Sequence, residues 1–163
     1  MTTSDEVQVS EEETMTPEEK VKKIVRNHVA ASMAVGLVPI PLVDFVGVTG
    51  IQLNMLRSLA KAYSVPFSKD KGKNVLTSLI GGGASLPIGV AFGSLVKLIP
   101  VIGQTTGALA MPATTGAMTY AVGKVFIQHF ASGGTFLTFD PEAVRAYYAE
   151  MLKEGEGVAA GAK

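Results

Sequence analysis

Apolar and polar positions recur along most of this chain with the spacing of helices, and prolines or glycines separate the helical stretches. The residues Thr-Pro-Glu-Glu at 16–19 predict a helix start, because the threonine and the second glutamate can each accept a hydrogen bond from the other's backbone amide. This helix ends before Pro39, and a second helix is expected over about 42–63, after an elbow formed by Pro39 and Pro41. The two helices form a first predicted hairpin over about 17–63.

The longest apolar stretch, Val75 to Gly123, contains a single charged residue, Lys97, with more than 20 uncharged residues on each side of it. A helix of about 20 residues covers the ~30 Å hydrocarbon layer of a bilayer, so this stretch has the length of transmembrane segments. We expect two helices here, joined by a second elbow at Pro100, which form a second hairpin over about 70–131. Lys97 lies at the tip of this hairpin, where its amine can contact lipid phosphate or extend to the interface.

Small residues recur at every fourth position in both helices of the second hairpin. Residues four apart share a helix face, so each stripe lets another backbone approach closely, as in membrane helix packing. The same stripes also suit a tightly packed bundle outside a membrane. The stripe residues are Gly81, Ser85, Gly89 and Gly93 in the third helix, and Ala113, Ala117 and Ala121 in the fourth.

The two ends of the chain differ from its apolar centre. Residues 1–15 are polar and acidic, which predicts a disordered lead. Asp-Pro-Glu at 140–142 predicts the start of an amphipathic helix over about 141–154, and the Gly/Ala-rich residues 155–163 are expected to form a flexible tail. The predicted organisation is therefore a single helical, membrane-associated domain over 16–154 between a lead and a tail.

Composition and charge narrow the class of protein. Charged residues make up only 17% of the chain and the formal net charge is zero, so no nucleic-acid partner is expected. There is no cysteine, which excludes disulfides and cysteine metal sites. If each elbow is a hairpin tip, the basic groups fall at the opposite, open end, and this bias predicts that both termini are cytoplasmic. The basic groups are Lys20 to Arg26, Arg57 with Lys61, Lys69 to Lys73, Lys124 and Arg145.

The first hairpin is too short to cross a bilayer. Its uncharged segment in the first helix, Asn27 to Val38, extends only about 18 Å along a helix axis. We expect this hairpin to enter a membrane part way, to lie in the interface, or to pack against the second hairpin.

Few residues in this chain suggest chemistry. Asp44 is the main candidate, because a carboxylate among apolar hairpin faces is costly unless it has a partner; the alternative is a cap on the second helix. Gln52 is interpreted as a packing contact across the hairpin, ahead of a role in ligand binding. His28 and His129 lack carboxylates at metal-ligand spacing, so no metal site is expected, and neither is a catalytic residue or a cofactor.

Several short segments occur in a characteristic order: Ala34 to Asp44 (AVGLVPIPLVD), then Gln52 and Met55, then Leu98 to Gly103 (LIPVIG), then Thr119 to Gly123 (TYAVG). This order resembles the YcjF-like domain of unknown function, a bacterial domain that often follows an Era-like GTPase domain in one chain. The resemblance covers about Val21 to Ala131. It implies helical hairpins, a membrane setting and a GTPase partner, but no known activity and no catalytic residues. This chain lacks the G-x-x-x-x-G-K-[ST] phosphate loop, so the GTPase would be a separate protein.

The predicted fold is all-α, with two helical hairpins that have proline elbows, followed by a C-terminal amphipathic helix, in a membrane-associated protein. The predicted function is a non-enzymatic membrane-inserting or scaffolding module in the cytoplasmic (inner) membrane of a bacterium. Its expected partners are the lipid bilayer, a second copy of the chain and a separate GTPase. Two alternatives stay open: an oligomeric pore or transporter-like protein with Asp44 and Gln52 in a polar path, and a soluble helical bundle that acts as a protein-interaction module.

Overall fold

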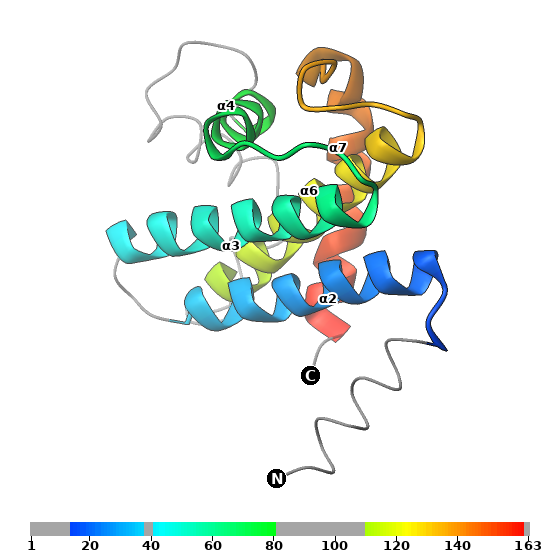
Figure 1. The fold of residues 1–163 in the computed structure, drawn as a ribbon. Coiled ribbons are helices and arrows are strands. Elements are labelled where there is room, and N and C mark those ends of the chain that lie inside the picture. Colours follow the sequence, from blue (N-terminus) through cyan, green and yellow to red (C-terminus); the bar gives the residue numbers. More distant parts are fainter. Residues whose placement is uncertain (1–13, 38–40, 81–109, 162–163) are drawn as a thin grey trace, which may run out of the picture.

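The computed structural model describes residues 14–37, 41–80 and 110–161 of the chain (Figure 1). Within these residues the fold is all-α, as predicted, and no strand is present. The helices are α2 (Pro17–Val35), α3 (Pro41–Ala62), α4 (Lys69–Ile80), α6 (Ala110–Ala131) and α7 (Pro141–Gly161). Several predicted features lie outside the described residues: most of the acidic lead, Pro39, Pro100, Lys97, and the stripe of Gly81, Ser85, Gly89 and Gly93.

Local sequence accounts for the start of α2. The Thr16 amide donates to Glu19 Oε2 at 2.8 Å, and the Glu19 amide donates to Thr16 Oγ1 at 3.3 Å, so the predicted capping box is confirmed. The bond from the Thr16 backbone also lowers the pKa of the Glu19 carboxyl, because it favours the charged form. Pro17 occupies the first turn, where its missing amide proton leaves no partner unpaired.

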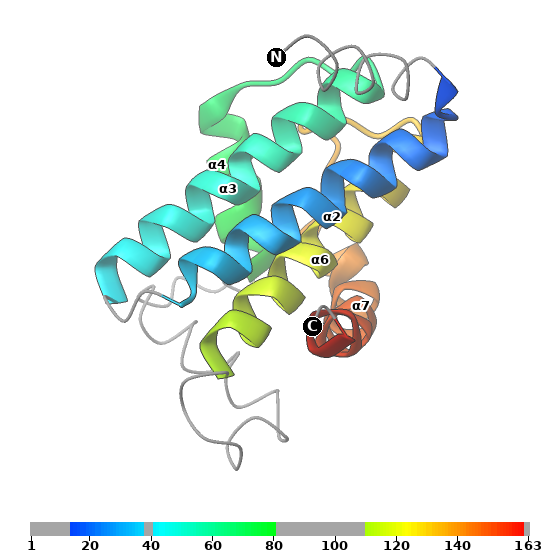
Figure 2. The same ribbon diagram turned by 90° about the horizontal axis from the view of Figure 1, so that it is seen from below.

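The helices α2 and α3 form the first hairpin, and they lie side by side in both views (Figures 1 and 2). The hairpin ends where α3 closes on a left-handed residue, Ser64, with a φ of 55°. The Val65 amide donates to the Ala60 carbonyl at 2.7 Å and the Ser64 amide donates to the Lys61 carbonyl at 3.2 Å. This pair of bonds is the Schellman pattern that stops a helix and turns the chain away from its axis.

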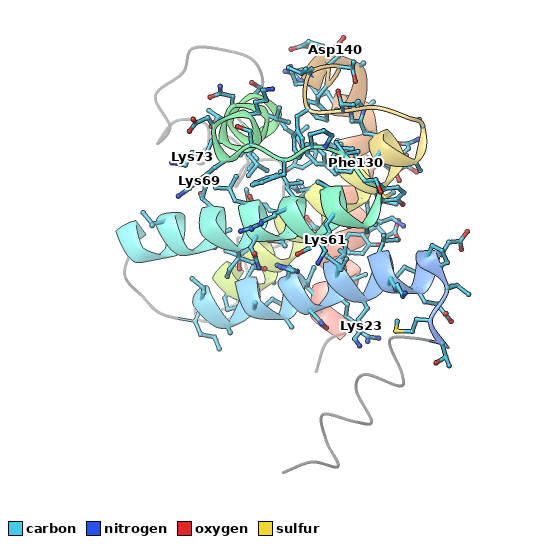
Figure 3. The ribbon with its side chains drawn as sticks, viewed as in Figure 1. Lys23, Lys61, Lys69, Lys73, Phe130 and Asp140 are labelled. Carbon is cyan, nitrogen blue, oxygen red and sulfur yellow. The ribbon has the colours of Figure 1, made fainter. Side chains whose placement is uncertain are left out.

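The next helix, α4, lies on the opposite side of α3 from α2 and packs against α3 and α7 (Figures 1 and 2). The described parts of the predicted second hairpin therefore do not pack along each other, because α6 lies against α2 and α7 instead. The placement of α4 also separates the basic groups. Figure 3 shows Lys69 and Lys73 on α4, across α3 from Lys23 on α2, so the basic residues do not all gather at one end as expected.

The core is built around α6, which contacts α2, α3 and α7. Its own buried side chains run along the length of the helix. They change in size, from small near the start to aromatic near the end. In order they are Thr115, Ala117, Met118, Thr119, Ala121, Val122, Val125, Phe126 and Phe130.

The last helix, α7, crosses the layer of α2, α3 and α6 steeply, since it is seen lengthwise in Figure 1 and nearly end-on in Figure 2. Asp140 caps it by accepting from the Glu142 amide at 3.0 Å. The helix continues to Gly161, seven residues beyond the end expected at Glu154. Residues 155–161 are thus helical where a flexible tail was expected. The reason is tertiary packing, because Gly155 and Ala159 are buried in this last part.

Among the described helices, none combines the length and apolar character that a membrane crossing requires. The stretch predicted to span a membrane has only its two ends in the described part, at 75–80 in α4 and at 110–123 in α6. The residues between them, 81–109, lie outside it.

Candidate functional site

A groove of about 580 Å³ lies between α2 and α6, near the point where the last turns of α7 reach them. Its volume falls in the range of roughly 300–1,000 Å³ that is typical of small-ligand sites. Apolar side chains line most of it, and they come from three helices. Those that matter here are Val25, Val29 and Met33 of α2, Ile127 of α6 and Val158 of α7.

Three cations, Lys22, Arg26 and Lys124, line the same groove, with a single carboxylate, Glu18, near one end. Lys22 and Arg26 are four residues apart on α2, so they share one face of the helix. In the described part of the chain, no carboxylate lies within 4.0 Å of any of these three cations as an ion pair. The groove lining therefore carries three positive charges and one negative charge, and none of the three cations is held in an ion pair by a described residue.

The charge is concentrated toward one end because α2 and α6 run in opposite directions. Val25 contacts the backbone at Gly123, whereas Met33 contacts α6 seven residues earlier, at Gly116. Following α2 from its start, the groove thus passes from its basic end to an apolar end. At the apolar end Met33 and Ala159 meet over Gly116.

Tyr120 and Lys124 form the α6 side of the groove at its basic end. The Lys124 amine lies 5.8 Å from the centre of the Tyr120 ring, a cation–π distance. The Tyr120 hydroxyl donates to Glu154 Oε1 at 2.5 Å and so ties α6 to α7. Burial, together with this bond and the negative charge of Glu154, raises the pKa of Tyr120 to about 12, so the hydroxyl stays protonated at neutral pH.

A second hollow, of about 420 Å³, lies between α2 and α3. His28 closes it on one side: its Nδ1 lies 2.7 Å from the Ile24 carbonyl and its Nε2 lies 3.2 Å from the Asn54 amide nitrogen. A carbonyl can only accept a hydrogen bond, so Nδ1 is the donor in its contact with Ile24. Both ring nitrogens are occupied within the fold, which leaves this histidine a structural role.

Toward one end of the bundle, three neighbouring helices each contain a long uncharged segment, and the only charged residue of α2, α3 and α6 beyond these segments is Asp44, in the first turn of α3. The uncharged segments are residues 27–35 of α2 with the turn at 36–37, residues 46–56 of α3 and residues 110–123 of α6, and these segments lie at the same end of the molecule (Figure 2). Two large apolar side chains are exposed there, Leu37 at 63% and Val46 at 68%. The nearest cations of α2 and α3 follow only beyond this end, at Arg26 and Arg57. The cations of α2, α3 and α6 therefore lie beyond these uncharged segments, which we call the uncharged end of the bundle. The last turns of α7, which carry Glu154 and Glu156, pack beside this end.

The structure places the two predicted polar candidates differently. Asp44 lies in the first turn of α3, and its side chain is outside the described part. Gln52 is only 1% exposed and donates to Thr119 Oγ1 at 3.4 Å. The bond joins α3 to α6 rather than to its hairpin partner α2. Gln52 thus lies in the packed interface between helices, and it lines neither hollow.

The small-residue stripe on α6 faces the interior of the chain. Ala117 and Ala121 are fully buried, and Ala113 is partly buried. A Cβ atom added at Gly155 of α7 would lie 2.8 Å from the Ala117 carbonyl oxygen, so the two backbones are nearly in contact. The stripe therefore serves packing within the chain, and Ala117 and Ala121 are not available to a second copy.

The two histidines lie apart from each other, each with contacts of its own. In the described part of the chain, no group of three or more histidine and acidic side chains gathers around a common point. His129 instead faces the loop after α6, where its Nε2 lies 2.8 Å from the Thr135 carbonyl.

Sequence reasoning grouped Lys22, Arg26 and Lys124 as basic, but it did not bring them together around a groove. The one available signal was the four-residue spacing of Lys22 and Arg26 beside the buried row Val21, Val25 and Val29. That spacing predicts a basic edge along an apolar face. It does not show which distant helix covers the face, so the contribution of α6 could not be anticipated.

This geometry defines an all-helical bundle with one uncharged end and a basic, apolar-floored groove. The chain belongs to the family described as a domain of unknown function, DUF697, which matches residues 4–155. It is 38% identical over 143 residues to magnetosome membrane protein 22 of Magnetospirillum gryphiswaldense, an alignment that covers 87% of this chain and 73% of that protein. No solved structure matches the chain described here. Family membership is thus established at the level of DUF697, and the narrower YcjF-like assignment stays a prediction.

Proposed function

We propose that this chain is a non-enzymatic, membrane-associated module that enters the cytoplasmic (inner) membrane of a bacterium with the uncharged end of α2, α3 and α6. The observation that carries the proposal is the separation of the cations of these helices from their uncharged segments, beside which Leu37 and Val46 are exposed; Asp44, in the first turn of α3, is the one charged residue of these helices beyond the segments. A protein surface that meets lipid tails avoids charge, and basic residues next to it meet the anionic head groups. The similarity to a magnetosome membrane protein supports a membrane setting.

The dimensions fit entry into one leaflet. The uncharged segment of α2, residues 27–35, extends about 13 Å along the helix axis, a little under half of the ~30 Å hydrocarbon layer. Entry to this depth leaves Lys20 to Arg26 and the start of α2 on the side of entry. The N-terminal end of the described part then lies with the head groups or in the cytoplasm, whereas the end of α7 packs beside Met33, next to the inserted segments.

We further propose that the inserted module acts as a scaffold, which associates with a second copy of the chain or with a separate GTPase. Association between copies would have to use a surface other than Ala117 and Ala121, because these residues are buried within the chain. The proposal of a GTPase partner rests only on the resemblance of the chain to YcjF-like domains.

The test is membrane association of the full chain after expression in bacteria. We expect the chain in the membrane fraction, retained after an alkaline carbonate wash, and reduced there when Leu37 and Val46 are both replaced by glutamate. Leu137→Glu is the matched control, because Leu137 is also an exposed leucine, at 77%, but lies in the loop after α6.

Two outcomes would contradict the proposal. One is recovery of the unaltered chain as a detergent-free soluble protein, which would favour a protein-interaction bundle. The other is equal loss from the membrane fraction in the double variant and in Leu137→Glu. This result would show that the uncharged end does not determine membrane association.

A further inference from the structure

We propose that the groove between α2 and α6 binds one anionic phospholipid, with the phosphate at Lys22, Arg26 and Lys124 and an acyl chain along the apolar floor toward Met33. This inference deepens the proposed membrane function by naming a lipid class and a site. The groove has the two parts that such a molecule needs. They lie in the order of a head group followed by a chain.

The first part is the charge. Three cations from two helices face the groove, and none of them has an ion-pair partner among the described residues. An anionic phosphate can accept charge-assisted hydrogen bonds from all three, whereas a zwitterionic head group brings its own positive charge into the same space. Charge complementarity therefore favours an anionic lipid over a neutral or zwitterionic one.

The second part is the apolar floor. Beyond Arg26, the groove face of α2 presents Val29, Ala30 and Met33, and Val158 of α7 closes the far end. From Arg26 to Met33 the distance along the axis of α2 is about 10 Å, so the floor holds the first part of an acyl chain and the rest extends past Met33 toward the uncharged end. Val158 is 42% exposed, and covering it and its neighbours with a chain removes apolar surface from water.

The direction of the groove agrees with the proposed membrane entry. Its apolar end lies toward the uncharged end of the bundle, and its basic end lies toward the cations of α2. A lipid bound in this orientation would be parallel to the lipids of the surrounding leaflet. It could enter the groove sideways, without turning over.

The alternative occupants are less well matched. A second copy of the chain would have to bring acidic side chains to three cations. Residues 1–15 of a copy contain such side chains but are mostly polar, so they would leave the apolar floor of the groove uncovered; a dimer is an outcome of the experiment below. A wholly apolar peptide would leave the cations unpaired. An anionic phospholipid matches both the cations and the apolar floor of the groove.

The experiment is native mass spectrometry of the full chain with two single-chain probes that share one acyl chain, palmitoyl-lysophosphatidylglycerol and palmitoyl-lysophosphatidylcholine. We expect one bound lysophosphatidylglycerol per chain, at concentrations about tenfold lower than the choline lipid requires, since charge-assisted bonds distinguish the two head groups. The probes are added as monomers, so binding does not require membrane insertion.

Matched variants separate the groove from general surface charge. Lys22→Gln with Arg26→Gln should abolish the preference for the anionic probe, whereas Lys20→Gln with Lys23→Gln removes the same charge from the same helix and should preserve it. Ala30→Phe should block both probes by filling the groove. Ala31→Phe, the neighbouring exposed position outside this groove, should leave binding unchanged.

The proposal is overturned if both charge variants lose the preference equally, if Ala30→Phe binds as well as the unaltered chain, or if many lipids bind without saturation. It is also overturned if the groove variants instead dissolve a dimer, which would make the groove an interface between copies. If a charge variant fails to fold, the Ala30 and Ala31 pair decides the question. Failure of the proposed function shows separately, because membrane fractionation of the Leu37 and Val46 variant does not depend on the groove.

Discussion

Near its start α6 is packed by small residues, and near its end by aromatic rings. At the start, the Thr115 hydroxyl donates to the Ser32 carbonyl at 3.0 Å, and a Cβ added at Gly36 would lie 2.7 Å from Thr115 Oγ1. A little further along, Gly155 of α7 lies against the backbone of Ala117. Here the distance between helices is set by backbone contact, and side chains contribute little volume.

At the other end, side chains set the distance. Phe126 and Phe139 stack with ring centres 4.8 Å apart, and Phe130 meets Phe136 edge-on at 5.2 Å. These rings hold the loop after α6 against the bundle. The loop itself opens at Gly133, whose positive φ of 83° favours glycine, because other residues are strained there.

The difference shows that one helix tolerates opposite kinds of change at its two ends. Removal of atoms should be costly at the aromatic end, where a cavity would remain. Addition of atoms should be costly at the small-residue end, where no space exists. Phe126→Ala and Gly155→Ala test this contrast directly, and Tyr148 of α7 extends it to a buried polar group.

Phe126→Ala should have the largest effect, because Phe126 is fully buried among four aromatic neighbours. We expect a loss of about 3–5 kcal/mol in the free energy of unfolding. The measurement is chemical denaturation followed by far-UV circular dichroism. Leu137→Ala, at an exposed position in the same loop region, should change the value by less than about 0.5 kcal/mol. A small effect at Phe126 would mean that the rings contribute little to the core.

Gly155→Ala should have the next largest effect, a loss of about 1–3 kcal/mol, because the added Cβ would lie 2.8 Å from the Ala117 carbonyl and 3.0 Å from its Cα. Gly157→Ala is the matched control two residues further along α7, with no atom within 4 Å of the added Cβ. It should stabilise the chain by about 0.5–1 kcal/mol through the better helix propensity of alanine. If the two substitutions change the free energy of unfolding in opposite directions, the close backbone contact at Gly155 is supported. Equal changes would contradict it.

Tyr148→Phe should have the smallest effect and the opposite sign. The Tyr148 hydroxyl is buried and has no hydrogen-bond partner within the described residues. Its removal should stabilise the chain by about 1 kcal/mol, since a buried polar group without a partner costs about that much or more. An unchanged or lower stability would show that the hydroxyl has a partner, such as a bound water.

The same tyrosine makes a prediction about alkaline pH. Burial raises the pKa of Tyr148, so the unfolded chain loses this proton at a lower pH than the folded chain. The stability contributed by the protonated form is complete below the unfolded pKa of about 10 and falls as the pH rises above it. In Tyr148→Phe this part of the loss disappears, so the difference in stability between the variant and the unaltered chain should widen above pH ~10. A difference in stability that stays constant above pH ~10 would contradict the raised pKa of Tyr148.

The sequence predicted well those features that depend on neighbouring residues. The capping box at Thr16 and the start of α7 at Asp140 both rest on bonds within three residues, and both are present. The bounds of α2 and α3 follow from prolines and apolar spacing, and they agree within about two residues.

Features set by distant contacts were predicted less well. The end of α7 was placed too early because its Gly/Ala-rich composition favours fraying, whereas burial of Gly155 against Ala117 keeps it helical. The α6 stripe was interpreted as a surface for another helix, which it is, but the helix is α7 of the same chain. The groove joins Lys22 to Lys124 across about a hundred residues, and no local pattern indicates such a pair.

The packing of α2 on α6 also determines the order in which the chain can mature on the ribosome. Roughly 75 residues separate the end of α2 from the start of α6, and at about 5–20 residues per second their synthesis takes roughly 4–15 s. During that interval the row Val21, Val25 and Val29 has emerged without the helix that covers it. The nascent chain therefore presents a basic, amphipathic helix before its fold can close. A nearby anionic membrane or a chaperone would meet that helix first.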